Sequence, residues 1–207
     1  GYPAFRGQQQ TIVDHVAGGS DALVLMPTGG GKSLCYQVPA IARHRVTHVY
    51  MPPTALYSLL DAPELVGSDT SSLKIFLLVG SPVSPEKLRQ AVEIFGPCLC
   101  QAYGQVESPM IVTWLAPEDV AESAAGDRPE RLASCGRPTR SVRVAIMGED
   151  GALLPDGEAG ELVVRGPQTM LGYWQRPEDT AQVLKDGWLY TGDVAVMDES
   201  GFFRIVD

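Results

Sequence analysis

Residues 73–101 read LKIFLLVGSPVSPEKLRQAVEIFGPCLCQ, and this stretch decides the fold class. Residues 73–79 form a short apolar run typical of a buried strand, residues 85–95 have the spacing of an amphipathic helix, and residues 98–101 form a second short apolar run. A strand, a helix and a strand at this spacing favour two parallel strands joined by a right-handed crossover. The sequence therefore predicts a Rossmann-like α/β unit.

The pattern changes on either side of this unit. Towards the N-terminus, residues 46–51 predict another strand and residues 54–60 a helix. After about residue 129 the chain turns to short strands, which we expect at 142–147, 160–165, 188–190, 194–197 and 202–206. Turn residues at 149–151 and 198–201 are typical of connections between antiparallel strands. The predicted fold class is α/β, with a parallel Rossmann-like unit followed by a mostly antiparallel β subdomain.

Composition limits the classes of protein that the chain can belong to. The 207 residues are 44% hydrophobic, which is enough for a real core. There is no apolar stretch of roughly 18 to 20 residues and no secretory signal pattern, so the sequence predicts a soluble, cytoplasmic protein without a membrane span.

Charge is distributed unevenly. Residues 1–43 hold three basic and two acidic side chains, which leaves 13 basic and 23 acidic side chains, a net charge of −10, in the rest of a chain whose total is −9. A surface of this sign repels a phosphate backbone, so the composition disfavours nucleic-acid binding.

The four cysteines are Cys35, Cys98, Cys100 and Cys135, and they form no CxxC pair and no cluster with histidine. Because unpaired cysteine usually packs as a small hydrophobic residue, we expect buried free thiols and no cysteine metal site.

A glycine-rich loop lies near the N-terminus. Residues 26–33 read MPTGGGKS, after an apolar run at 22–26 and before a predicted helix at 32–40. Backbone N–H groups at Gly29 and Gly31 could point at phosphate oxygens, Lys32 would meet the terminal phosphates, and Ser33 would hold magnesium. The strict Walker A pattern fails only at its first position, which is Met26.

Together with Gln9 and the sequence LCYQVP at 34–39, this loop makes residues 2–42 resemble the N-terminal segment of RecQ-type DNA helicases. The resemblance implies that Gln9 reads adenine and that the loop binds ATP. It covers about a fifth of the chain, and the helicase arginine fingers and second motor domain are not found. Residues 194–199, VAVMDE, have the form of a Walker B strand, but the following Ser200-Gly201 favours a hairpin turn.

Residues 44–207 resemble an internal fragment of the adenylate-forming superfamily, most of all its fatty-acid or aryl-acid CoA ligases. Six motifs carry the resemblance in the family's order: MPPT (51–54), GSP (80–82), YGQVE (103–107), GEL (160–162), GYWQRPE (172–178) and WLYTGD (188–193). The chain is thus predicted to be a chimera with parts at residues 1–43, 44–128 and 129–207.

The resemblance implies a role for several residues. Adenine would contact Gly80, Ser81 and Pro82 at the end of a strand, where open α/β sheets place ligands, and also Tyr103 and Gly104. Asp193 would accept the two ribose hydroxyls. The catalytic residue would be Glu107, as a hard carboxylate ligand for Mg²⁺ near the α-phosphate. Two alternatives stay open, in which Tyr103 is a core aromatic residue and Asp193 a turn residue.

The implied cofactors are ATP and Mg²⁺, with coenzyme A by resemblance only, and the implied substrate is a fatty or aryl carboxylic acid. Val106 replaces the family's threonine and Ala102 a common glycine. In the family the threonine hydroxyl contacts the phosphate or the acyl carboxylate, so leaving a buried partner unpaired would weaken catalysis by about 1–3 kcal/mol. The family's own phosphate loop and its C-terminal domain with the catalytic lysine are not found.

The sequence is compatible with three functions. The chain could be a ligase-like nucleotide binder with impaired or no catalysis, a P-loop ATPase or helicase fragment, or a chimera without enzymatic function. Uncovered sheet edges predict self-association.

Overall fold

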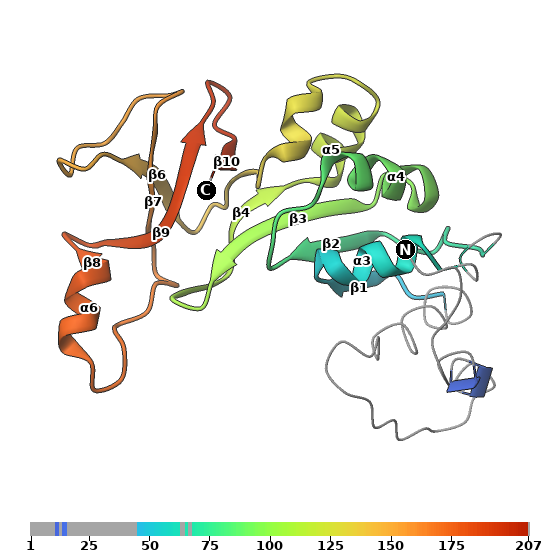
Figure 1. Cartoon of the computed structure of the whole chain (residues 1–207), viewed down its shortest axis with the longest axis horizontal. Helices are drawn as coiled ribbons and strands as arrows, with labels where there is room; N and C mark the ends of the chain where they lie inside the picture. The colour runs from blue at the N-terminus through green and yellow to red at the C-terminus, as the bar shows by residue number, and fades with distance from the viewer. Residues whose placement is uncertain (1–10, 13, 16–44, 63–64, 66–67, 207) are drawn as a thin grey trace.

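A computed structural model of the chain describes residues 11–12, 14–15, 45–62, 65 and 68–206. Figure 1 shows two sheets next to each other, with helices packed beside the first sheet. We call the sheets A and B. This arrangement confirms the predicted fold class, an α/β unit followed by an antiparallel β region. The domain boundaries at residues 43 and 128 stay a prediction.

Sheet A has the strand order β1-β2-β3-β4-β5. Its strands are β1 (His48–Met51), β2 (Ile75–Val79), β3 (Leu99–Gln105), β4 (Ser108–Leu115) and β5 (Arg137–Pro138). The first three are parallel, as the strand-helix-strand pattern predicts, whereas β4 and β5 are antiparallel to their neighbours. No strand is predicted from the sequence at β4, whose second residue is Pro109, a residue that argues against a strand interior.

The helices of the first region are α3 (Pro53–Leu60), α4 (Pro85–Phe95), α5 (Pro117–Ala124) and the short 3₁₀ helix η2 (Pro129–Ala133). Helix α4 begins at Pro85, whose fixed φ suits the first helical position, and ends before Gly96, which has a φ of 77°. It buries Leu88, Ala91 and Phe95, which recur every three or four residues along one face. Phe95 then packs edge-on against Phe76 of β2, with 5.0 Å between ring centroids, so the helix is anchored on the sheet.

Sheet B has the order β10-β9-β7-β6, and β8 pairs with β9. Its strands are β6 (Arg143–Met147), β7 (Ala159–Arg165), β8 (Leu184–Lys185), β9 (Trp188–Met197) and β10 (Phe203–Ile205), and α6 (Pro177–Val183) lies between β7 and β8. The two short strands predicted at 188–190 and 194–197 are one strand, β9. In the turn between β9 and β10, Asp198 Oδ1 accepts the N–H groups of Ser200 and Phe202. The turn interpretation of this acidic segment is therefore confirmed.

The two sheets join at a short segment after η2. Cys135 N–H donates to Phe203 O (2.8 Å), and Phe203 N–H donates to Gly136 O (2.9 Å), so β10 of sheet B pairs with the segment that leads into β5 of sheet A. Gly136 has a φ of +93°, and a Cβ there would lie 2.0 Å from the backbone carbonyl carbon of Trp114. Only glycine allows this close approach, which fixes sheet B against β4.

The described cysteines are free thiols, as expected. Cys98 and Cys100 are buried and Cys135 is half-buried, whereas Cys35 lies outside the described residues. Burial raises the pKa of Cys98 to about 11 and that of Cys100 to about 12. Both thiols are therefore protonated at neutral pH and serve as packing residues.

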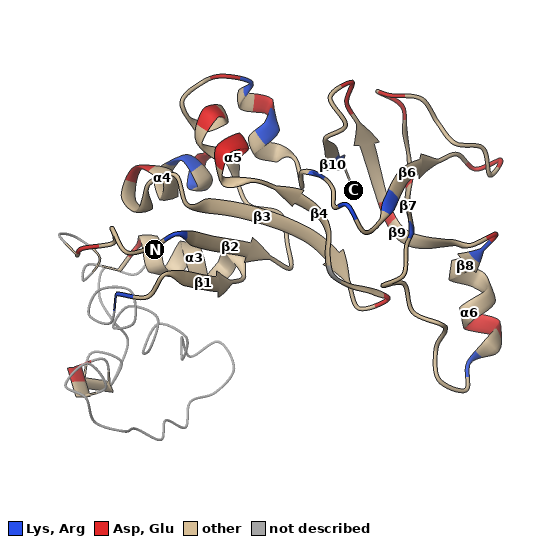
Figure 2. Cartoon of the chain, turned by 180° about the vertical axis from the view of Figure 1, so that it is seen from behind, with Lys and Arg blue, Asp and Glu red and all other residues tan. Residues whose placement is uncertain are grey.

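Acidic side chains are spread over the described surface, including helices α5 and α6 (Figure 2). Each of these two helices has two acidic residues in its first turn. Among the described helices, none is long and apolar enough to cross a membrane.

Candidate functional site

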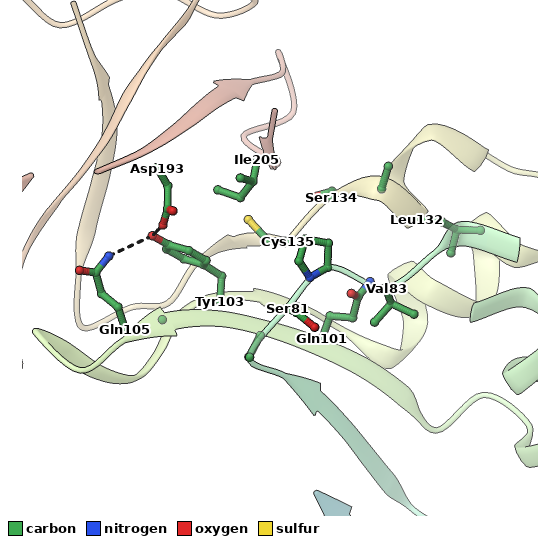
Figure 3. Close-up of a pocket in the computed structure, with 15 residues that line it drawn as sticks. Ser81, Val83, Gln101, Tyr103, Gln105, Leu132, Ser134, Cys135, Asp193 and Ile205 are labelled. Carbon is green, nitrogen blue, oxygen red and sulfur yellow. Dashed lines mark hydrogen bonds between the residues drawn. The ribbon is translucent and has the colours of Figure 1, made fainter. Parts of the chain in front are cut away.

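A cavity of about 270 Å³ opens where the carboxyl ends of β2 and β3 face sheet B. It is lined by residues 80–83 after β2, residues 101–105 of β3, residues 132–135 at the end of η2, and Asp193 and Ile205 from sheet B (Figure 3). Ligands of open α/β sheets bind at this end of the strands. The volume is near the lower end of the range for small-molecule sites.

Six residues predicted from the sequence meet in this one cavity: Gly80, Ser81, Pro82, Tyr103, Gly104 and Asp193. The first three follow β2, the next two belong to β3, and the last belongs to β9. Gly80 has a φ of 100°, which lets the chain leave the strand sharply and turn along the cavity wall.

Two more residues line the cavity, Gln101 and Gln105, which lie two positions before and after Tyr103 on β3. Residues two apart along a strand share a face, so the alternation would have pointed to both glutamines once Tyr103 was chosen. Neither glutamine is among the site residues predicted from the sequence. Gln101 is buried at 7% exposure, and its Nε2 has no hydrogen-bond partner among the described residues. A buried donor of this kind is costly unless a ligand or water satisfies it.

Asp193 owes its position to an irregularity in β9. Glu161 of β7 pairs with Val194 and Val163 pairs with Tyr190, so the three residues from Thr191 to Asp193 face a single residue of β7. Such bulges re-aim side chains beside functional sites. Gly192 has a φ of 81°, and its N–H donates to Glu161 Oε1 (2.9 Å). Asp193 is therefore part of a strand bulge and not of a simple turn.

Thr191 holds this bulge from inside. Its Oγ1 donates to the carbonyl oxygen of Leu162 (2.7 Å) and accepts the N–H of Asp193 (3.2 Å). The side chain of Asp193 then accepts a hydrogen bond from the Tyr103 hydroxyl (Figure 3). The cavity is thus closed on one side by a bond between the two sheets.

The Tyr103 hydroxyl also accepts a bond from Gln105 Nε2 (3.4 Å), which donates to Thr191 O as well (3.3 Å). The pKa of Tyr103 is raised well above its ordinary value, first by burial and then by the hydrogen bond to Asp193. Tyr103 therefore stays neutral and donates a hydrogen bond to the Asp193 side chain, and its ring forms part of the cavity wall.

Glu107 does not line the cavity but lies in the turn between β3 and β4, two residues beyond Gln105. Its Oε1 accepts a hydrogen bond from the Tyr173 hydroxyl (2.8 Å), and its carbonyl oxygen accepts the N–H of Met170 (2.7 Å). The bond to Glu107 is the main cause of the raised pKa of Tyr173. The carboxylate is thus held by a neutral donor.

Val106 stands beside Glu107 with 89% of its surface exposed. An exposed side chain at this position could meet a phosphate or an acyl carboxylate, so the loss expected from replacing threonine by Val106 stays a prediction. Ala102, the other departure, is buried in the cavity wall.

The described residues contain no group of three or more His, Cys, Asp or Glu side chains that could hold a metal ion. A magnesium ion at Glu107 would take its other ligands from phosphate and water, which is usual for Mg²⁺. The remaining predicted contacts, Gln9, Gly29, Gly31, Lys32 and Ser33, lie outside the described residues.

The sequence model of the AMP-binding enzyme family matches residues 15–174. The chain belongs to this family. The match supports the ligase-like part of the sequence prediction. It begins within the segment predicted to be helicase-like, and nothing in these comparisons supports a helicase Walker A segment there.

Two curated relatives and one solved structure show how far the similarity extends. The medium/long-chain-fatty-acid–CoA ligase FadD8 of Mycobacterium tuberculosis is 44% identical over 81% of this chain and 28% of its own length. The feruloyl-CoA synthase of an Amycolatopsis species is 39% identical over 81% of this chain and 32% of its own length. The solved structure of the amide bond synthetase McbA of Marinactinospora thermotolerans matches with a TM-score of 0.75 and 44% identity. The match covers 82% of this chain and 33% of the McbA chain. The chain therefore spans about a third of the length of these relatives.

Proposed function

We propose that the cavity binds the adenosine part of ATP and of an acyl-adenylate, in a ligase that forms AMP. The observation that carries this proposal is the meeting of the segment 80–82, Tyr103 and Asp193 in one cavity, although they lie after β2, on β3 and on β9 of two different sheets. An enzyme of the AMP-binding family needs a pocket for adenosine, because its reaction joins a carboxylic acid to AMP.

Each wall of the cavity offers one kind of contact. The Tyr103 ring gives an aromatic face for the base, and the unpaired Nε2 of Gln101 gives a donor for a ring nitrogen of adenine. Asp193 can exchange its bond from the Tyr103 hydroxyl for bonds from two ribose hydroxyls. These contacts recognise a neutral nucleoside, which suits a chain whose net charge is −9.

Chemistry on the α-phosphate would take place beyond the ribose, towards Glu107. The carboxylate would hold Mg²⁺, which neutralises the phosphate charge when bound. Glu107 fits this task because, among the described residues, only its Oε1 is engaged, by the Tyr173 phenol. The overall reaction would be ATP plus carboxylic acid giving acyl-adenylate plus pyrophosphate. The acid would be fatty or aryl, a class that the names of FadD8 and feruloyl-CoA synthase support. The thiol of coenzyme A would then accept the acyl group from the adenylate, with release of AMP.

Calorimetric titration with AMP tests the binding proposal. Asp193→Ala should lower AMP affinity by at least tenfold, because a hydrogen bond to a charged acceptor contributes about 1.5–3 kcal/mol and 1.4 kcal/mol is tenfold. Asp127→Ala, at an exposed aspartate away from the cavity, is the matched control. Equal AMP affinity in both variants would remove the ribose role of Asp193. Acid-dependent exchange of pyrophosphate into ATP then tests whether catalysis is retained or impaired.

The P-loop segment is a separate part of the proposal. The pattern MPTGGGKS at residues 26–33 supports phosphate binding there. The division of the chain at residues 43 and 128 stays part of the proposal. Two results together would reject the P-loop function and keep only the ligase proposal. Lys32→Ala would leave ATP affinity unchanged, and DNA would not stimulate phosphate release. The cytoplasmic location and self-association through sheet edges also remain proposals.

A further inference from the structure

The connection from β7 to α6 passes the tip of the hairpin formed by β3 and β4, as both whole-chain views show (Figures 1 and 2). Two bonds join this connection to Glu107 at the tip. Met170 N–H donates to the backbone carbonyl of Glu107 (2.7 Å), and the Tyr173 hydroxyl donates to its side-chain Oε1 (2.8 Å). One segment thus fixes both the backbone and the carboxylate of the same residue.

Tyr173 is itself held by the next helix. Its N–H donates to Thr180 Oγ1 (2.9 Å), and Thr180 Oγ1 donates to the carbonyl oxygen of Arg176 (2.8 Å). A Cβ at Gly172 would lie 2.9 Å from Thr180 Cγ2, so glycine lets the chain approach the helix closely. The backbone of Tyr173, whose phenol contacts Glu107, is therefore held in place against α6.

Without this contact, little would orient the Glu107 side chain. It lies in a turn beside Val106, which is 89% exposed. A glutamate in such a place loses considerable rotamer freedom when a ligand fixes it. The Tyr173 hydroxyl occupies Oε1, whereas no donor among the described residues is bonded to Oε2.

We propose that Tyr173 is a positioning residue, which orients the Glu107 carboxylate so that its second oxygen meets a nucleotide-bound magnesium ion. This inference rests on the proposed function. Partners that orient metal ligands commonly change metal affinity by 10–100-fold when they are removed. Because Glu107 is half-buried, the lower end of that range applies here.

The test uses Tyr173→Phe, which keeps the ring and removes only the hydroxyl. ATP binding is titrated at a series of Mg²⁺ concentrations, and AMP binding is measured without Mg²⁺. The Mg²⁺ concentration at half-maximal ATP affinity should rise about tenfold, while AMP affinity stays within about twofold. Tyr50→Phe, which removes a hydroxyl from a 66% exposed tyrosine on β1, should leave both values unchanged.

Thr180→Val provides a second variant, which removes the acceptor for the Tyr173 N–H and should shift the Mg²⁺ dependence in the same direction. Hydrogen exchange of residues 106–108 without nucleotide should be faster in Tyr173→Phe than in the wild type. An unchanged Mg²⁺ dependence in both variants, with normal AMP binding, overturns the role of Tyr173 alone. A wild-type chain that binds neither AMP nor ATP overturns the proposed function as well.

Discussion

The hydrogen bond between Tyr103 and Asp193 provides the sharpest test of how the two sheets are coupled. It joins β3 of sheet A to β9 of sheet B across 90 residues of sequence. Tyr103→Phe keeps the ring and removes the donor, and Asp193→Ala removes the acceptor. Comparing the two single variants with the double variant isolates the energy of the pair.

A hydrogen bond to an ionised group contributes about 1.5–3 kcal/mol, and both side chains are half-buried. We therefore expect each single variant to lose about 1–2 kcal/mol of unfolding free energy, with a coupling energy of at least about 1 kcal/mol. With a urea m-value of about 2 kcal/mol/M, each single change lowers the unfolding midpoint by about 0.5–1 M. Circular dichroism during urea titration in nucleotide-free buffer measures these shifts.

The Gln105 bond to Tyr103 is lost in the same substitution, so Gln105→Ala serves as a correction for that weaker contact of 3.4 Å. If the double variant loses the sum of the two single losses, the pair contributes no coupling. The closure of the cavity by this bond would then have no energetic basis, and the reasoning would be refuted.

Three further predictions concern packing, thiol chemistry and the family threonine. Gly136→Ala should cost several kcal/mol of unfolding free energy, because its Cβ would lie 2.0 Å from the Trp114 backbone at a φ of +93°; a urea midpoint equal to wild type would contradict this. The raised pKa values of Cys98 and Cys100, about 11 and 12 against an ordinary 9.0, mean that the folded state keeps protons that the unfolded state releases. Their stabilisation is thus full below pH 9 and is lost as pH rises towards 11–12, and both thiols should resist alkylation at pH 8 until urea unfolds the chain. Val106→Thr should leave stability within about 0.5 kcal/mol, since the side chain is 89% exposed, and should raise acid-dependent pyrophosphate exchange; a loss of exchange would show that the valine is favourable.

Much of the first sheet could be predicted from local sequence. Residues 85–95 form a helix over the whole predicted range, because Pro85 can begin a helix and Gly96 can end one. The prediction did not include β4, because this strand is defined by its pairing with residues 101–103 of β3. A local sequence pattern does not show which strand will be its partner. The bulge at residues 191–193 was not predicted either. The sequence shows two separate strand patterns at 188–190 and 194–197, and it does not indicate that they form one strand with a bulge between them.

By itself, the sequence determined the fold class and the residue types of the cavity, because hydrophobic spacing and short motifs are properties of neighbours along the chain. It could not determine which of these residues meet. Only the tertiary structure decided that Tyr103 bonds Asp193, and that Glu107, 66 residues before Tyr173, is held by that tyrosine outside the cavity. The geometry of such contacts depends on backbone approach and strand register, which a linear order of residues does not contain.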